Sequence, residues 1–228
     1  MRGRRRAIDS QTPMDQGTCM SRDTRKRILV ASLLLFNDNG EPGTTTNEIA
    51  DEVDISPGNL HYHFRKKALI VDALLDEFRV DAARVLDPPP PDGVFIDDFW
   101  VFLHELLELT SAYRFLFRDL ESLAERYPSA LRTLGHFARG LAGVFELWIR
   151  ALGTSSELST SEAEASGIGR NLAVIALFSE RFDRLLGRRD DADDAALRVA
   201  AAILEAIRPL AAADSRTHVD ELAGRYRR

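Results

Sequence analysis

The stretch TTTNEIADEVDISPGNLHYHFRKK, residues 44–67, determines how the rest of the chain is read. Its first part, residues 46–53, predicts a two-turn helix because three apolar residues share one face at helical spacing: Ile49, Ala50 and Val53. A tight turn follows, after which the Ser56 hydroxyl is placed to cap a second helix that begins at Pro57. The stretch therefore encodes two short helices joined by a turn.

The second helix has one apolar side and one polar side. Leu60 and Phe64 lie four residues apart and can pack inward. This arrangement leaves an outward face of small, amide, imidazole and phenol groups at Gly58, Asn59, His61, Tyr62 and His63. The pattern is typical of a helix-turn-helix whose second helix enters a DNA groove, although such shapes also occur in proteins that do not bind DNA.

A longer motif extends this interpretation. TxxIA at residues 46–50, followed by ISxGNLxYHFxxK at residues 55–67, resembles the DNA-binding signature of TetR-type transcriptional regulators. The chain departs from that signature at His61, where tyrosine is usual, and at Ala68, where an acidic residue is usual. The resemblance implies a helix cap at Ser56. It also implies DNA contacts by six residues: Thr46, Gly58, Asn59, Tyr62, His63 and Lys67.

Chemistry divides these residues into two groups. The hydroxyls of Thr46 and Ser56 and the Lys67 ammonium suit phosphate oxygens, which position a protein without reading sequence. Asn59 and Tyr62 are better suited to base edges, because an amide can pair with adenine and a phenol ring can contact a thymine methyl. His61 can donate a hydrogen bond to phosphate.

Composition restricts the class of protein. The chain has 228 residues, of which 45% are hydrophobic and 29% are charged, as expected of a globular protein that can bury a core. The single cysteine, Cys19, excludes an internal disulfide and favours a reducing, cytoplasmic compartment. The sequence contains no apolar run of about 18 residues, so we expect no membrane span. No hydrophobic segment follows the opening MRGRRR, which argues against a secretory signal.

The net charge is unevenly distributed. Residues 1–80 hold 12 basic and 12 acidic residues, so the formal charge of −6 belongs to the remainder. DNA binding would therefore depend on the local arrangement of charge and not on bulk basicity.

Proline-rich and polar segments mark the boundaries between parts of the chain. Residues 1–20 have almost nothing to bury and predict a disordered leader, which is either a basic arm toward DNA or a segment upstream of the true start at Met14 or Met20. Four consecutive prolines, residues 88–91, end a long helix and form an extended spacer. The predicted parts are a leader (1–20), a helix-turn-helix domain (21–66), a connecting helix (67–87), a linker (88–93), a helical effector-binding and dimerisation domain (94–213) and a tail (214–228).

The second half predicts only helices. Apolar stripes run through residues 95–112, through 113–124, along a helix starting at Pro128, and through 168–185 and 197–210. The last two stripes either pair with their copies in a second subunit or close the core of one monomer. We favour a homodimer through residues 161–186 and 193–213, because one helix-turn-helix reads only a half-site.

The resemblance extends over about residues 24–123. Together with the helix-turn-helix, LDPP at residues 86–89, FWVFLHELLE at 99–108 and YRFLFRDLESL at 113–123 are similar to the PhaD-like TetR regulators of polyhydroxyalkanoate metabolism. The resemblance implies about nine helices, dimerisation through the last two, and a C-terminal pocket for a small hydrophobic effector such as a fatty acyl group or acyl-CoA.

The effector site has a weaker signal. Candidate lining residues are aromatic or apolar residues on the C-terminal helices, together with polar residues that interrupt them: Trp100, Leu103, His104, Phe117, Arg118, Phe137, Phe145, Asn171 and Phe178. Aromatic residues at helical spacing also form plain cores, and each polar residue can instead be structural.

The sequence gives little support for an enzyme. His61 and His63 lie on different helix faces and no cysteine or third histidine joins them, so we expect no metal and no cofactor. HELLE at residues 104–108 lacks the second histidine of a zinc-protease helix, and Gly167 and Gly169 follow no strand.

The sequence therefore predicts an all-α, ligand-responsive DNA-binding regulator, acting as a repressor on a near-palindromic operator. The alternative is a helical acyl- or lipid-binding module without sequence-specific DNA binding.

Overall fold

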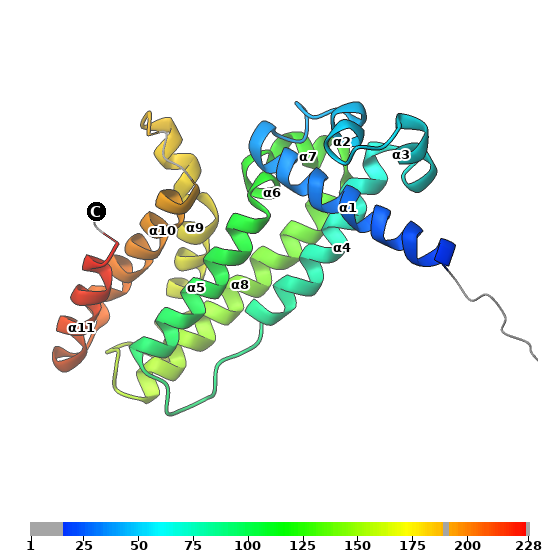
Figure 1. Ribbon diagram of the computed structural model, residues 1–228. Helices are drawn as coiled ribbons and strands as arrows, with labels where there is room; N and C mark the ends of the chain where they lie inside the picture. The colour runs from blue at the N-terminus through cyan, green and yellow to red at the C-terminus, as the bar shows by residue number, and fades with distance from the viewer. Residues whose placement is uncertain (1–15, 189–191, 227–228) are drawn as a thin grey trace, which may run out of the picture.

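The computed structural model describes residues 16–188 and 192–226. Within these residues the chain forms eleven α-helices and one 3-10 helix, and no β-strand (Figure 1). The predicted all-α class is confirmed, with eleven helices in place of the nine expected.

The N-terminal body consists of three helices: α1 (Gln16–Asn39), α2 (Thr46–Glu52) and α3 (Pro57–His63). A small apolar core joins them, and its residues are all buried: Phe36, Ile49, Val53, Leu60 and Phe64. Asp54 adopts a positive φ of 54° in the turn between α2 and α3. Short aspartate side chains tolerate this left-handed conformation better than most residues.

Helix α4 (Lys67–Val85) connects the N-terminal body to the rest of the molecule. It packs against α1 at one end and against α5 (Ile96–Ala112) and α8 (Pro128–Thr154) beyond it (Figure 1). Its inward stripe is fully buried: Ile70, Val71, Leu74, Leu75 and Phe78.

The C-terminal body is a helical bundle in which α8 lies along α9 (Glu162–Leu185), and α9 lies along α10 (Ala192–Ile207). An aromatic cluster fills the space between α4, α5 and α8. The centres of the Phe78 and Phe137 rings lie 5.1 Å apart, and the rings of Phe99 and Phe102 pack against that of Phe145. Gly169 allows α9 to approach the backbone of α8 closely, because an added Cβ would lie 2.5 Å from the backbone nitrogen of Glu146.

Three predicted boundaries were wrong. The helix expected over residues 113–124 is broken at Asp119 into α6 (Arg114–Arg118) and α7 (Leu120–Arg126). The Asp119 carboxylate accepts a hydrogen bond from the backbone N–H of Glu41 at 3.1 Å, so a contact distant in sequence holds this break.

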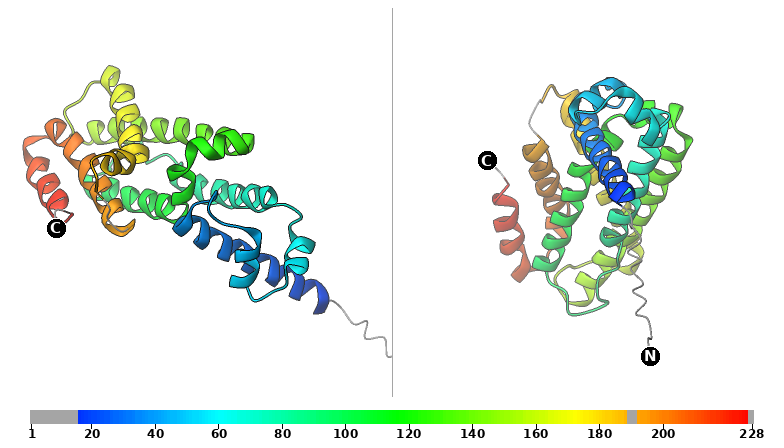
Figure 2. Two further views of the ribbon diagram at one scale, coloured as in Figure 1. Left: turned by 90° about the horizontal axis from the view of Figure 1, so that it is seen from above. Right: turned by 45° about the vertical axis from the view of Figure 1, so that its right-hand side comes forward.

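The other two corrections concern the termini. Helix α1 already includes residues 16–20, which lie inside the predicted disordered leader. The predicted tail after residue 213 is helix α11 (Ala213–Gly224), which packs on α10 and α5 (Figure 2). It buries an apolar stripe formed by Val219, Leu222, Ala223 and Tyr226. The remainder of the leader, residues 1–15, lies outside the described residues.

Candidate DNA-binding surface and effector crevice

Helix α3 presents an exposed polar face on the outside of the N-terminal body. Gly58, Asn59 and His61 are exposed, and Tyr62 is 79% exposed although its ring is large and partly apolar. His63 is half-buried, and the centre of its ring lies 5.3 Å from that of Tyr62. An added Cβ at Gly58 would meet only the Ser56 hydroxyl at 3.9 Å, so glycine leaves this surface open for close approach.

Caps fix the two short helices of the motif. The Ser56 hydroxyl accepts a hydrogen bond from the Asn59 N–H at 3.2 Å, and Pro57 occupies the first turn, as predicted. Helix α2 carries a capping box, in which the Thr45 hydroxyl accepts from Glu48 N–H and the Glu48 carboxylate accepts from Thr45 N–H. Thr46 is half-buried at the first position of α2.

Basic residues adjoin this face. Arg65 and Lys66 follow α3 and are exposed. On α1, Arg25 and Lys26 are exposed, and the Arg25 guanidinium lies 4.8 Å from the centre of the Phe64 ring. The α1 residues were not among the predicted contacts, and the signal that could have identified them is the basic run at residues 25–27. The polar face therefore has positive charge on two sides, which suits a polyanion.

Lys67 differs from the other predicted contacts because its side chain points into the protein. Its ammonium donates to the backbone oxygens of Glu41 at 2.8 Å and Thr44 at 2.7 Å. It also pairs with the Glu41 carboxylate at 2.9 Å. An ammonium has three hydrogens, so all three have acceptors within the protein.

Glu41 links α4 and α7 through one buried carboxylate. Besides Lys67, it accepts from the Tyr127 hydroxyl at 2.6 Å and pairs with Arg126 at 2.7 Å. Burial, followed by the hydrogen bond to Glu41, raises the pKa of Tyr127. The start of α4 is thereby tied to the end of α7.

Helix α6 holds the C-terminal end of α1. The Arg118 guanidinium donates to the backbone oxygens of Phe36 and Asn37, both at 2.8 Å, and Arg114 donates to Asn37 O at 2.9 Å. In return, the buried Asn37 side chain accepts from the Phe115 N–H at 3.1 Å. These bonds satisfy the Asn37 carbonyl at the end of α1 and an N–H at the start of α6. They also add a second donor to Phe36 O, which already accepts from the Gly40 N–H at 3.0 Å.

The nine predicted effector residues do not form one pocket. Leu103, Phe137 and Phe145 are buried core residues, whereas Asn171 and Phe178 are exposed on α9. The aromatic cluster occupies the space in which a ligand was expected.

Trp100 and His104 belong to a separate hydrogen-bonded group with Tyr226, which lies just beyond the end of α11. The Trp100 indole donates to the Tyr226 hydroxyl, which lies 3.1 Å from Nε2 of His104. Nδ1 of His104 lies 2.9 Å from the backbone oxygen of Trp100, so Nδ1 carries the hydrogen, because a carbonyl can only accept. Burial raises the pKa of Tyr226.

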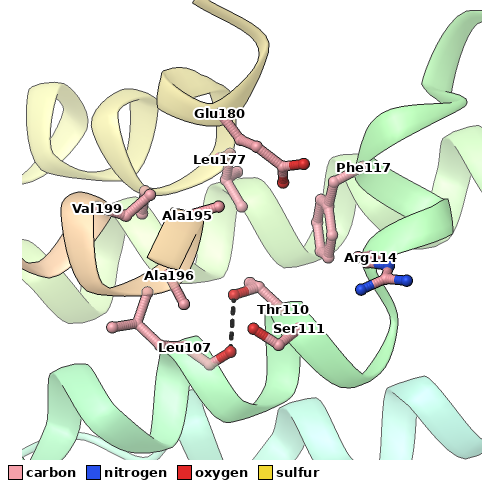
Figure 3. A pocket seen from close by; sticks show the side chains of 11 residues that line it. Leu107, Thr110, Ser111, Arg114, Phe117, Leu177, Glu180, Ala195, Ala196 and Val199 are labelled. Carbon is pink, nitrogen blue, oxygen red and sulfur yellow. Dashed lines mark hydrogen bonds between the residues drawn. The ribbon is translucent and has the colours of Figure 1, made fainter. Parts of the chain in front are cut away.

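An apolar crevice lies instead between α5, α6, α9 and α10 (Figure 3). Of the predicted residues only Phe117 lines it. The other lining residues were missed by sequence reasoning, since they come from four helices: Leu107, Thr110, Ser111, Arg114, Ala176, Leu177, Glu180, Ala195, Ala196 and Val199. Its volume is about 40 Å³, which suffices for water but not for an acyl chain.

The described part of the chain lacks two further kinds of feature. No helix there combines the length and apolar character needed to cross a bilayer. No group of three or more histidine, cysteine, aspartate or glutamate side chains there is placed to hold a metal ion.

Comparison with family models and known proteins identifies relatives. Residues 28–74 match the model for bacterial regulatory proteins of the tetR family, and residues 77–219 match the TetR model described as a bacterial transcriptional repressor. The HTH-type transcriptional regulator YvkB of Bacillus subtilis is 25% identical over 121 residues, which are 50% of this chain and 64% of YvkB. The chain therefore spans less than two thirds of that relative's length.

Solved structures agree with these matches. A TetR-family transcriptional regulator from Marinobacter aquaeolei VT8 superposes with a TM-score of 0.80 at 28% identity, covering 90% of this chain and 99% of that one. CprB of Streptomyces coelicolor, solved with its operator sequence, shares the fold with a TM-score of 0.63 at 19% identity, covering 90% and 96% of the two chains.

Proposed function

Since the chain belongs to the TetR family of bacterial transcriptional regulators, which bind DNA, we propose that it is a homodimeric repressor whose operator binding responds to a small hydrophobic effector. The observation that carries the proposal is the exposed polar face of α3, which has basic residues on two sides. The PhaD-like resemblance adds a fatty acyl group or acyl-CoA as the proposed effector class.

DNA contact is assigned to the α3 face and its surroundings. Asn59 and Tyr62 are proposed to read base edges. Contacts to the DNA backbone and its phosphates are proposed for Thr46, Ser56, Gly58, His61 and His63. The internal bonds of Lys67 favour a positioning role for its ammonium over a phosphate contact.

Dimer formation is supported by the surface of α9. Large apolar side chains recur there at spacings of three and four and are exposed to solvent: Val174, Phe178, Phe182 and Leu185. An exposed apolar stripe of this kind on a helix is typical of a surface covered by a partner. Helix α10 contributes less to this surface than we expected, because α11 covers part of it and only Leu197 among its described large apolar residues is exposed.

The test is titration of the purified protein against its own promoter DNA at two salt concentrations, with and without an acyl-CoA. Specific, salt-sensitive binding to a near-palindrome that weakens with acyl-CoA is the expected result. Binding without any DNA preference would favour the alternative of a helical acyl-binding module.

Base reading can be tested separately. Asn59→Ala should change the preferred base at one position of each half-site, while Arg132→Ala, a change at an exposed position of α8, leaves the preference intact. A selection from randomised operators measures this. Equal losses of affinity on all operators from Asn59→Ala would contradict the assignment.

A further inference from the structure

Residues 36–41 hold the DNA-binding body on the C-terminal body. They comprise the last turn of α1 and the start of the turn that follows it, and we call them the joint segment. The Phe36 ring packs on Phe115 of α6, with the ring centres 5.3 Å apart. Such apolar packing keeps two bodies together but does not fix the angle between them, because hydrophobic attraction has no direction. The angle therefore depends on hydrogen bonds.

Asn37 makes two of these bonds through one buried side chain. Its Nδ2 donates to the backbone oxygen of Ala112 at 2.8 Å, and its Oδ1 accepts from the Phe115 N–H at 3.1 Å. The short amide thus bridges the end of α5 and the start of α6. Because hydrogen bonds weaken steeply when bent, rotation of α1 against these helices would break both. Arg118 also donates to Asn37 O, but its long side chain has enough rotatable bonds to follow a small rotation.

Glu41 fixes the other end of the joint segment. Its carboxylate is fully buried and accepts from the Tyr127 hydroxyl at 2.6 Å, and its backbone N–H donates to Asp119 at 3.1 Å. Gly40 brings the chain close to α6 and α7, since its φ is +84° and an added Cβ would lie 3.2 Å from the Asp119 carboxylate. The joint segment is therefore held at two separate points, one against α5 and α6 and one against α7.

The position of the joint segment gives these bonds an effect at a distance. Figure 1 shows α3 on one side of the molecule and α9 and α10 on the other. The proposed DNA contact is made by α3 and the proposed subunit contact by α9, and the joint segment lies where the two bodies meet. A small change of angle there becomes a larger displacement at α3. In a two-fold dimer, the separation and relative rotation of the two α3 helices follow from this angle.

DNA geometry makes that separation a matter of specificity. One turn of the duplex is about 34–36 Å long and contains about 10–10.5 base pairs. Each base pair added between two half-sites therefore moves them apart by about 3.4 Å and rotates one against the other by about 35°. A dimer whose α3 helices are held at a fixed angle must then deform the DNA or release one half-site.

We propose that the hydrogen bonds of the joint segment, chiefly those of Asn37 and Glu41, determine which spacing between operator half-sites the dimer accepts. Both side chains are buried, so they are positioning residues that act on specificity without contacting DNA. Helix α3 selects the bases, and the joint segment selects the distance between them. This inference rests on the proposed homodimeric DNA-binding function and adds a second source of operator specificity to it.

The experiment measures affinity for a series of operators. All have the half-sites that the selection from randomised DNA yields, and their spacing differs from the preferred one by one or two base pairs in either direction. We expect the wild type to lose at least about a hundredfold in affinity at two base pairs, because only one half-site is then engaged. A single half-site, titrated separately, reports on the α3 face alone.

The test variant is the double substitution Asn37→Ala, Tyr127→Phe. It removes the Asn37 amide and the Tyr127 hydroxyl but keeps the packing of Phe36 on Phe115, and Glu41 retains Lys67 and Arg126 as partners. Its affinity for the best operator should fall only a few-fold, because less of the dimer is preorganised. Two base pairs of altered spacing should then cost no more than about tenfold, since the looser joint lets both half-sites remain engaged. Affinity for the single half-site should not change.

The matched control is the double variant Ser32→Ala, Tyr113→Phe. The buried Ser32 hydroxyl donates to Ile28 O within α1, and the Tyr113 hydroxyl donates to Asp81 of α4, both at 2.7 Å. Neither bond joins α1 to α5, α6 or α7. The control loses a buried polar group and a phenol hydroxyl, as the test variant does, and should keep the spacing preference of the wild type. Thermal melting compares the stability of the two double variants.

Several outcomes would overturn the inference. One is a wild type that accepts all spacings equally while still preferring its operator over random DNA, which would leave the proposed regulator intact. Others are a test variant as strict as the wild type, or equal loss of strictness in the test variant and the control. A loss on the single half-site as large as that on the best operator would place the effect in α3 instead.

The single variant Tyr127→Phe decides the matter if the double variant does not fold. It removes one hydroxyl, and the loss at two base pairs should be at least about threefold smaller than in the wild type, whereas an unchanged loss would overturn the inference. No preference for the operator over random DNA at any spacing, by a wild type that is folded, would overturn the proposed function itself.

Discussion

At the scale of single residues, the bonds of Lys67 favour a structural role within the DNA-binding body over a direct contact to DNA. Its ammonium hydrogens are all bonded internally, to Glu41 and Thr44. We therefore expect Lys67→Ala to lower the free energy of unfolding by about 2 kcal/mol, because the buried Glu41 carboxylate loses a partner. Operator affinity should fall while its salt dependence stays unchanged, as measured by urea denaturation and by titrations at several salt concentrations.

Lys66 provides the control for this prediction. It is the preceding residue and its side chain is exposed, so Lys66→Ala should leave stability nearly unchanged. If Lys67→Ala instead lowered the slope of log affinity against log salt by about 0.9 and left stability intact, Lys67 would be a phosphate contact after all.

Glu48 adds a pH-dependent contribution to the same domain. The backbone N–H of Thr45 and then its hydroxyl hold the pKa of Glu48 below its ordinary value of 4.5. A pKa lower in the folded state than in the unfolded state gives stability that is present above the unfolded pKa and is lost as the pH falls through the folded pKa. Glu48→Gln should therefore be less stable than wild type at pH 7, and the difference should shrink below about pH 4.

Urea denaturation at pH 7 and near pH 3 measures this difference. Glu52→Gln on the same helix alters an exposed carboxylate without such bonds and serves as the control. A deficit of Glu48→Gln that is the same at both pH values would show that the capping box does not depend on the charge of Glu48.

At the scale of helices, the α8–α9 contact depends on Gly169. A Cβ there would lie 2.5 Å from Glu146 N and 2.8 Å from Ala142 O, and both are backbone atoms of α8. Gly169→Ala should therefore separate the two helices and destabilise the protein by about 1–3 kcal/mol. Gly167→Ala on the same helix meets nothing within 4 Å and should be neutral or slightly stabilising, because alanine favours helix. Thermal melting compares the two, and equal effects would contradict the close contact.

Local spacing explains which helices could be predicted. The cap at Ser56 and the inward pair Leu60 and Phe64 are determined within a few residues of sequence, and the structure has them as predicted. The break at Asp119 could not be found in this way, because its cause is the backbone N–H of Glu41, 78 residues away. The apolar stripe of α11 is visible in the sequence. The hydrogen bond from Trp100 to Tyr226 is not, because the two residues are 126 positions apart.

The candidate effector site was less predictable for a related reason. Aromatic residues on helices indicate apolar packing but not whether the space between them is filled, and here the rings fill it. Arg118 was a predicted anchor, yet sequence does not show that the same guanidinium also holds two carbonyls of α1. Sites built across four helices depend on the packing of the whole domain.

At the scale of the whole molecule, the exposed stripe on α9 leads to a prediction about assembly. Phe182 is 61% exposed and Leu185 is 85% exposed. Burial of such side chains against a second copy would release water from apolar surface, at about 25 cal/mol per Å². A two-fold partner would also bring two α3 helices to one operator.

The double variant Phe182→Asp, Leu185→Asp should therefore be a folded monomer. A charge on each side of a two-fold interface faces its own copy, so repulsion and desolvation both oppose association. Because the two half-site contacts are then no longer joined, operator affinity should fall about a hundredfold or more. Light scattering after size exclusion gives the mass, and circular dichroism confirms that the helices remain.

The matched control places the same charges on apolar residues that are exposed elsewhere. Val80 on α4 is 66% exposed and Leu131 on α8 is 54% exposed, so Val80→Asp, Leu131→Asp changes the net charge equally without touching α9. This control should remain dimeric and keep its operator affinity. A wild type that is monomeric at micromolar concentration, or an α9 variant that remains a dimer, would show that this stripe is not the subunit interface. Two separate half-site contacts would then have to be joined through another surface.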